Sequence, residues 1–348
     1  MNFPRVKELL PQLLMLIVVT GAAQKVPRTY IAHITSGPIQ IDGHAWEPSW
    51  NNAQWSELFT DIEGVKKPAY DTRFKMLWDK DNLYFFAELQ EPHVWGTLKQ
   101  RDTVIFYNND FEIFIDPDGD THNYYEFEIN ALNTTWDLFL TKPYRNQGKV
   151  LNSWNMAGVK TAIDINGTLN NPMDTDKGWN IEIAIPWSEI TEASATGKVP
   201  ADDFWRLNFS RVNWDHDLIG GKYSRKKDPN TGTYLPEYNW VWSAQEVINM
   251  HEPERWGYVY FSTIAAGGEN GFTIPKDEYL KWQLYSWYRM IRARKEPLSE
   301  IALDSVSIWG EMVKPEMEKS AFGWNIWVKS PFTHKVMSVS KDGKYEVH

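Results

Sequence analysis

The chain has 348 residues, with 36 Lys and Arg against 46 Asp and Glu, a formal charge of −10 and no Cys. Without thiols it has no disulfides, no cysteine nucleophile and no thiolate zinc or iron–sulfur site, so a metal must bind through oxygen or imidazole. The acidic charge also provides no electrostatic footprint for nucleic acid, which requires clustered Lys and Arg. We therefore expect no nucleic-acid partner.

Aromatic residues make up 15% of the chain, with 19 Trp, 16 Tyr and 16 Phe. Aromatic rings fill protein cores, and they also offer flat amphipathic faces to ligands. A sugar is such a ligand, because its C–H faces stack on an indole while its hydroxyls form hydrogen bonds at the edges. A large core accounts for most of the 19 Trp but need not account for all of them.

Residues 1–23 have the composition of a secretory signal peptide. Arg5 and Lys7 precede an apolar run from Leu9 to Val19, and small residues follow at 21–23. The run is too short to span about 30 Å of hydrocarbon, so a cleaved signal is favoured over an uncleaved anchor. No later stretch approaches a membrane span. We expect an exported protein, located in the periplasm, outside the cell or at its surface.

From residue 39 to about 261, short alternating or apolar segments are separated by turn residues. The segments cover 72–78, 83–89, 111–115, 124–130, 136–140, 179–185, 205–212 and 257–261. Many short strands with this spacing predict an all-β fold, an antiparallel β-sandwich of the jelly-roll or immunoglobulin-like type.

The composition changes after residue 263. Residues 265–271 indicate a linker, and Pro275 followed by acids predicts a helix start. The helix should cover about 276–295, with an apolar stripe docked on the sandwich or, alternatively, on a partner protein. The stripe consists of Leu280, Leu284, Trp287, Tyr288 and Ile291. Short strands and a hairpin turn at 341–343 should follow, which divides the chain into 1–23, 24–263 and 264–348.

An ordered series of motifs carries a family resemblance. The series is 39–43, 83–85 with 91–95, 109–117, 124–130, 179–187, 206–211 and 251–257. It resembles carbohydrate-binding module family 9 over roughly residues 28–262, and the tail resembles the extension of stand-alone exported members. The resemblance implies a β-sandwich that binds chain ends, monosaccharides and disaccharides between aromatic side chains, with calcium ions holding loops.

The resemblance also implies an aromatic clamp. The candidates are Trp95 and Trp242, with Asn239 as a polar edge contact. Trp240 could replace Trp242, because strand alternation puts both on one face. For each of these Trp residues, a place in the core is the alternative.

Polar residues of the predicted strands offer contacts to sugar hydroxyls. Alternation puts Asp110 and Glu112 on one face, the acids of 124–130 on one face, and Arg211 with Asn213 on another. In one interpretation the acidic row faces solvent, because charged side chains are rarely buried without partners. In the other, Arg211 pairs with one of these carboxylates and forms a bidentate floor for the sugar.

A metal site is predicted in the turn that contains Asp116, Asp118 and Asp120, with Asp42 as another possible ligand. Three carboxylates in a tight turn suit calcium, and the resemblance favours it, although the same residues also make an ordinary hairpin turn. Zinc is disfavoured, because the eight His form no H-x-x-x-H pair on a helix.

The sequence thus predicts noncatalytic binding of mono-, oligo- or polysaccharides, in the service of polysaccharide capture or catabolism. One alternative is a glycoside hydrolase using Glu126 and Glu128, whose bases would lie about 6.5–7 Å apart on a strand rising about 3.3 Å per residue. Another alternative is a protein-interaction scaffold built on the aromatic C-terminal tail.

Overall fold

The structure is a computed structural model that describes residues 25–294, 301–321 and 323–348. The signal peptide predicted at 1–23 lies outside the described residues. Within them, no helix is both long and apolar enough to cross a membrane.

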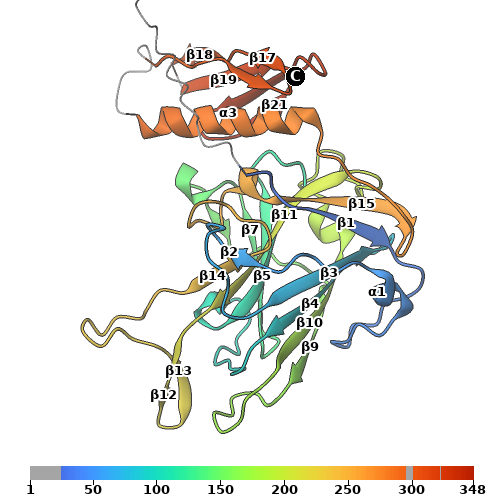
Figure 1. Ribbon diagram of the computed structural model, residues 1–348, viewed down its shortest axis with the longest axis vertical. Coiled ribbons are helices and arrows are strands. Elements are labelled where there is room, and N and C mark those ends of the chain that lie inside the picture. Colours follow the sequence, from blue (N-terminus) through green and yellow to red (C-terminus); the bar gives the residue numbers. More distant parts are fainter. Residues whose placement is uncertain (1–24, 295–300, 322) are drawn as a thin grey trace, which may run out of the picture.

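One continuous sheet of 13 strands forms the main body of the molecule (Figure 1). Its path is β8-β7-β6-β5-β11-β15-β1-β3-β4-β10-β9, and β14 joins its side by pairing with β11 and β2. The strands are β1 (Thr29–Ile34), β2 (Thr60–Asp61), β3 (Thr72–Trp78), β4 (Asn82–Gln90), β5 (Asp110–Asp116), β6 (Tyr124–Asn130), β7 (Thr135–Leu140), β8 (Val150–Leu151), β9 (Lys160–Asn166), β10 (Gly178–Pro186), β11 (Phe204–Asn213), β14 (Tyr238–Val241) and β15 (Gly257–Ala265).

The sheet folds over so that its two halves face each other across an aromatic core. The ring of Phe74 in β3 lies 4.0 Å from that of Phe209 in β11, centroid to centroid. Phe59 and Phe111 stack at 6.2 Å in the same core. The predicted all-β sandwich is therefore confirmed. It is not purely antiparallel, because β1 pairs in parallel with both β15 and β3.

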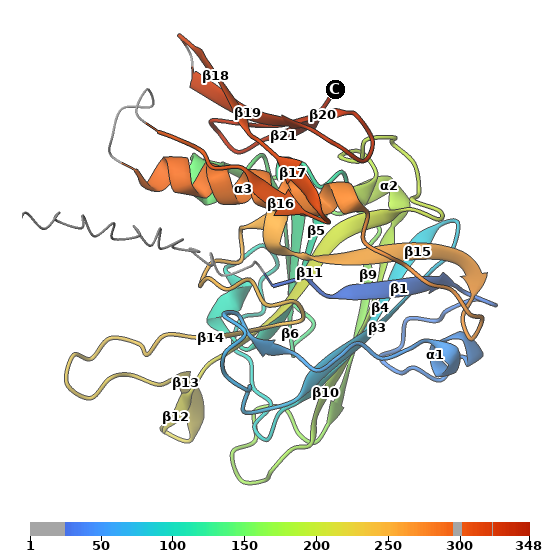
Figure 2. The ribbon, with the colours of Figure 1, turned by 45° about the horizontal axis from the view of Figure 1, so that its top comes forward.

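Short elements complete the sandwich. They are α1 (Pro48–Asn52), α2 (Trp187–Ile190), the 3₁₀ helices Ile105–Tyr107, Tyr144–Asn146 and Pro253–Arg255, and the hairpin of β12 (His216–Ile219) and β13 (Lys222–Arg225). The hairpin projects away from the body of the molecule (Figure 2).

The C-terminal extension has its own small core. Helix α3 (Lys276–Ala293) lies inside the range predicted for it, between the sandwich and a four-stranded sheet (Figures 1 and 2). The strands of the extension are β16 (Val306–Ile308), β17 (Glu311–Val313), β18 (Glu316–Ser320), β19 (Gly323–Lys329), β20 (Val336–Ser340) and β21 (Tyr345–Val347). The turn predicted at 341–343 joins β20 to β21, and Gly343 adopts the positive φ of 89° that favours glycine.

Most of the predicted apolar stripe of α3 does not dock on the sandwich, although its Tyr288 donates to the sandwich residue Asn146 at 2.7 Å. The stripe packs against Trp324, Ile326, Val328, Met337 and Val339 of the four-stranded sheet. The prediction was wrong because a small sheet with one apolar face needs a cover, and the nearest helix supplies it.

Another side of α3 holds the extension on the sandwich. The indole Nε1 of Trp282 donates to the hydroxyl of Tyr258 at 2.8 Å, and Arg289 pairs with the buried Glu254 at 3.1 Å. One face of α3 thus packs in the core of the extension, while another face binds the sandwich.

Candidate functional site

A pocket of about 310 Å³ opens on the outer face of the sheet, over β5, β6, β7, β11 and β14. Strand register builds its floor. Glu112 lies opposite Glu128, and Phe114 lies opposite Glu126, in the β5–β6 pair. Because side chains alternate, Phe111, Ile113 and Ile115 point to the core while Asp110, Glu112 and Phe114 point outward. We call this the sheet-face pocket.

The carboxylates of this face are buried. Asp110, Glu112, Glu126 and Glu128 have relative exposures of 0, 5, 4 and 1%. The interpretation that the acidic row faces solvent is therefore wrong. Residues from three loops, among them Phe106, Tyr144 and His251, line the pocket above the strands and shield the carboxylates from water.

Burial raises the pKa of these four carboxyl groups. The pKa of Glu112 rises to about 7, with the nearby Glu237 adding to the effect. The pKa values of Asp110, Glu126 and Glu128 lie well above their usual range, first through burial and then through repulsion by neighbouring carboxylates. Among the described residues, no Lys or Arg lines the pocket. The site is therefore acidic and has no cation of its own.

Aromatic side chains line the same pocket. Phe106 and Trp136 are half-buried, and Tyr144 is 47% exposed, so their rings keep part of a face free. Trp136 lies opposite Glu128 in the β6–β7 pair, which places an indole beside a carboxylate. Asn239 and Asn249 add amide groups to the lining. Such a lining combines stacking faces with directional hydrogen-bonding groups.

The structure brings only some of the predicted polar contacts together. Asp110, Glu112 and Asn239 belong to the outer face, because Val212 pairs with Asp110 on one side and with Asn239 on the other. Arg211 is the neighbour of Val212 along β11, so its side chain points to the opposite, inner face.

Arg211 forms a buried ion pair on that inner face. Its guanidinium donates to Glu91 at 2.6 Å and to Asn213 at 2.9 Å, and its relative exposure is 0%. Burial raises the pKa of Glu91, while Arg211 and the Asn109 amide oppose the shift. The predicted pairing of Arg211 with the acidic row is therefore wrong. Arg211 and Asn213 bind across the core, away from the sheet-face pocket.

The predicted aromatic clamp is not assembled. Trp242 is fully buried, with its ring against Phe74 at 5.4 Å and Phe209 at 5.9 Å. Trp240 is 4% exposed, and the Arg211 guanidinium lies 5.0 Å from its ring centroid. Neither indole has a face free for a sugar.

Trp95 lies in a different small cluster. It is 2% exposed and stacks on Tyr223 of the β12–β13 hairpin, at 6.1 Å and 16°. Sequence reasoning missed the aromatic residues that do line the pocket. Phe106 and Tyr144 lie in 3₁₀ turns, and the positions of these turns depend on tertiary contacts. Trp136 was part of a predicted strand, but the sequence did not reveal that Glu128 lies opposite it; the register between β6 and β7 shows this.

The acidic turn faces the C-terminal extension. Asp116, Asp118 and Asp120 can place one oxygen each within 4.8 Å of the others. Asp116 accepts the backbone N–H groups of Gly119 and Thr121, both at 3.0 Å, and the Lys344 ammonium lies 3.6 Å from Asp120.

Asp42 belongs to neither acidic cluster of the described chain and accepts the N–H of His44. Carboxylate oxygens suit calcium chemically, and calcium at the acidic turn stays a prediction.

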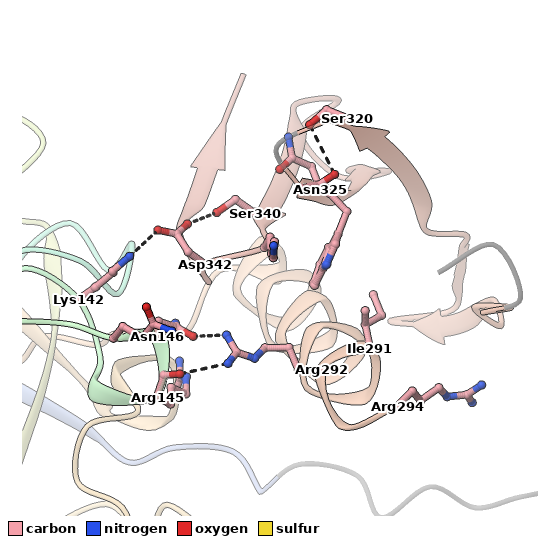
Figure 3. Close-up of a pocket in the computed structure, with 14 residues that line it drawn as sticks. Lys142, Arg145, Asn146, Ile291, Arg292, Arg294, Ser320, Asn325, Ser340 and Asp342 are labelled. Atoms are coloured by element: carbon pink, nitrogen blue, oxygen red, sulfur yellow. Dashed lines mark hydrogen bonds and ion pairs between the residues drawn. The ribbon is translucent and has the colours of Figure 1, made fainter. Parts of the chain in front are cut away.

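A larger hollow of about 790 Å³ separates the extension from the sandwich (Figure 3). Polar contacts cross it. Lys142 pairs with Asp342 at 3.1 Å, and Arg292 donates to the carbonyl of Arg145 at 3.1 Å and to the side chain of Asn146. Because these contacts join residues of the sandwich to residues of the extension, we assign the hollow to the junction of the two parts.

The family of the chain follows from its sequence match. Residues 41–262 match the model of the family described as carbohydrate family 9 binding domain-like. This range contains the strands that build the sheet-face pocket and ends before the extension. The chain belongs to carbohydrate-binding family 9.

Curated relatives of this family 9 protein share one segment with it. Endo-1,4-beta-xylanase A of Thermoanaerobacterium saccharolyticum and exoglucanase XynX of Acetivibrio thermocellus are each 28% identical over 181 residues. That segment is 52% of this chain but only 13 and 14% of the two enzymes.

Among solved structures, a protein from Bacteroides uniformis described as carbohydrate-binding is similar. It aligns over 68% of this chain and 99% of its own, with 15% identity and a TM-score of 0.50. This likeness supports the fold.

Proposed function

We propose that this family 9 protein binds carbohydrate in the sheet-face pocket without covalent chemistry. One observation carries the proposal. Partly exposed aromatic faces and buried carboxylates meet in one pocket, within the part of the chain that matches the family. Sugars need this combination, because they present apolar C–H faces and hydroxyl edges together.

The roles of the residues follow from their places. Trp136, with Phe106 and Tyr144, offers ring faces to the C–H groups of the sugar. Glu112 and Asn239 lie where they can accept hydrogen bonds from hydroxyls. The volume is at the low end of ligand pockets, which run from about 300 to 1,000 Å³, so a monosaccharide, a disaccharide or a chain end fits best.

Electrostatics favours an uncharged sugar. The carboxylates Glu112, Glu126 and Glu128 line the pocket, and no Lys or Arg of the described chain lies among them. A uronate or a sulfated sugar would bury its own charge beside these carboxyl groups, and no cation lining the described pocket would pair with that charge, which is unfavourable. We therefore propose neutral glycans as the ligand class.

The test is calorimetric titration of the chain from Gln24 with neutral mono- and oligosaccharides. Fragments of xylan and cellulose come first, because the curated relatives are named xylanase and exoglucanase. Trp136→Ala should weaken binding by about tenfold or more, since a ring at the centre of a site contributes about 2 kcal/mol. Trp46→Ala is the matched control, because Trp46 is 73% exposed and does not line the pocket. Equal affinities of Trp136→Ala and the unsubstituted chain would refute the assignment.

We also propose that the protein is exported and serves polysaccharide capture or catabolism. The composition of residues 1–23 supports export. Cell fractionation with N-terminal sequencing should find a chain that begins at Gln24 outside the cytoplasm. A cytoplasmic chain that still carries Arg5 would contradict export.

A further inference from the structure

At the floor of the sheet-face pocket lie carboxylates that pair with no cation of the described chain. Glu112 and Glu128 line the pocket, and Asp110 lies beside them on the same face of the sheet. Asp110, Glu112 and Glu128 can each place one oxygen within 4.8 Å of the other two. All three are at least 95% buried. They come from β5 and β6, whose register fixes their spacing, so they cannot separate without breaking the sheet.

Two further observations point to a missing partner. Neither oxygen of Asp110 has a hydrogen-bond partner in the described chain. Glu126, which is 4% exposed and lines the same pocket, also has one buried oxygen, Oε2, without a partner. Buried polar atoms are nearly always hydrogen-bonded, so orphaned oxygens in one place indicate that something outside the chain binds them.

The chemistry of the cluster selects a hard cation. Its ligands are all carboxylate oxygens, which suit calcium, magnesium and manganese rather than zinc or copper. Calcium takes six to eight oxygens at about 2.3–2.6 Å, so opposite ligands lie up to about 5 Å apart. Magnesium demands a tighter octahedron and usually keeps several waters. An irregular group of buried carboxylates with an open pocket above it fits calcium better.

We propose that Asp110, Glu112 and Glu128 bind a calcium ion at the floor of the sheet-face pocket, with Glu126 as a further ligand. The ion directs its open coordination positions into the pocket, where sugar hydroxyls bind them. The ion site stands on the carboxylate geometry and on the buried oxygens without a partner, and it does not depend on the proposed function. Only its role toward sugar rests on the proposed function.

This site differs from the acidic turn of Asp116, Asp118 and Asp120. In the turn, backbone N–H groups and Lys344 already approach the carboxylates. The two clusters therefore provide matched controls for each other, because each has three carboxylates with one fully buried Asp.

The experiment titrates the EDTA-treated chain with terbium, whose luminescence a nearby indole sensitises, and then displaces terbium with calcium. The indole of Trp136 lines the pocket. Glu112→Gln should weaken calcium binding by about tenfold or more, because it removes one charged ligand. Asp118→Asn should leave binding at the pocket unchanged.

Glu112→Gln keeps the shape of the side chain and removes a repulsive charge, and circular dichroism checks its fold. Should it not fold, Glu128→Gln makes the same test. Failure of the unsubstituted chain to bind terbium or calcium at millimolar concentration would overturn the site. Binding that survives Glu112→Gln but is lost in Asp118→Asn would overturn it too and assign the ion to the acidic turn.

Sugar titrations with calcium and with EDTA separate the two proposals. We expect sugar affinity to fall at least about tenfold in EDTA. Calcium binding at the pocket without any sugar binding would refute the proposed function and keep the ion site. Sugar affinity equal under both conditions would keep the proposed function and overturn the role of the ion.

Discussion

The Arg211–Glu91 pair gives the sharpest test of which predicted polar residues belong to the inner face of the sandwich and which belong to the sheet-face pocket. We assign Arg211 to the inner face of the sandwich, where it stabilises the fold and touches no sugar. The change is Arg211→Met, which keeps most of the volume and removes the charge. It should lower the free energy of unfolding and leave the sugar affinity of the folded chain unchanged.

The magnitude follows from what the substitution leaves behind. Arg211 donates to Glu91 at 2.6 Å, to Thr72 at 3.1 Å and to the carbonyl of Gln90 at 2.8 Å. Without it, the carboxylate of Glu91, 4% exposed, keeps hydrogen bonds from the Asn109 side chain, at 3.1 Å, and from the His93 backbone, but loses its charged partner. Removing one partner of a buried pair costs about 3–5 kcal/mol, a large share of the roughly 5–15 kcal/mol that holds a protein folded.

The assay is urea unfolding followed by circular dichroism. With a slope near 3 kcal/mol per molar urea, the midpoint should fall by roughly 1 M or more. The matched control is Arg73→Met, because Arg73 pairs with Glu88 at 2.7 Å while the two side chains are 41 and 38% exposed.

Loss of that exposed pair and of the contact of Arg73 with the Trp55 ring should cost about 1 kcal/mol. Equal costs for the two variants would refute the reasoning. So would a folded Arg211→Met chain that no longer binds sugar.

Three further predictions concern stability. Trp242→Ala should cost about 3–5 kcal/mol in thermal unfolding, because the fully buried indole fills the core, and an unchanged melting temperature would contradict its place there. Burial lowers the pKa of His251 to about 3 from 6.5, so the unfolded chain binds the extra proton between these values and stability falls as pH falls through that window. His251→Gln should remove a loss of about 3 kcal/mol between pH 7 and pH 4, measured by comparing the free energies of unfolding at these two pH values. Leu284→Ala should cost about 2–5 kcal/mol in the extension core and leave sugar affinity unchanged; altered sugar affinity would show that the extension contributes to the pocket.

Strand positions could be predicted because local signals agree with the fold. The segment predicted at 124–130 is β6, Tyr124–Asn130, and the one predicted at 72–78 is β3, Thr72–Trp78. Alternation marks a strand with an inner and an outer face, and turn residues mark its ends. The edge strand β9, the hairpin β12–β13 and the central strand β1 were among the strands missed. Half-exposed residues give a weak pattern in β9 and in the hairpin, whereas β1 finds its partners β15 and β3 only in the tertiary structure.

The site could be predicted only in part. The local sequence shows which side chains share one face of a strand, but it does not show which strand or loop will lie against that face. Alternation placed Asp110 and Glu112 together on one side of a strand, which the structure shows. It could not tell which strand would lie beside them, so the pairing of Arg211 with that row was wrong. It also gave no sign that loops would cover the outer face, so burial of the row was missed.

The fold itself shows why the sheet-face pocket is exceptional. Elsewhere in the described chain, buried carboxylates have a cation or several N–H donors. Arg211 pairs with Glu91 and Arg145 with Glu254 at 2.9 Å, while Glu182 accepts from the backbone of Asp42 and Gly43 and from the Trp50 indole. Unpaired buried charges destabilise a fold, so they are kept mainly where they serve a function. The cluster around Asp110 lacks any such cation in the described chain, although one Lys or Arg at Val212 or Asn239 would have provided it. Compensation must therefore come from protons or from a bound partner, and an open pocket directly above the cluster is where a partner can enter.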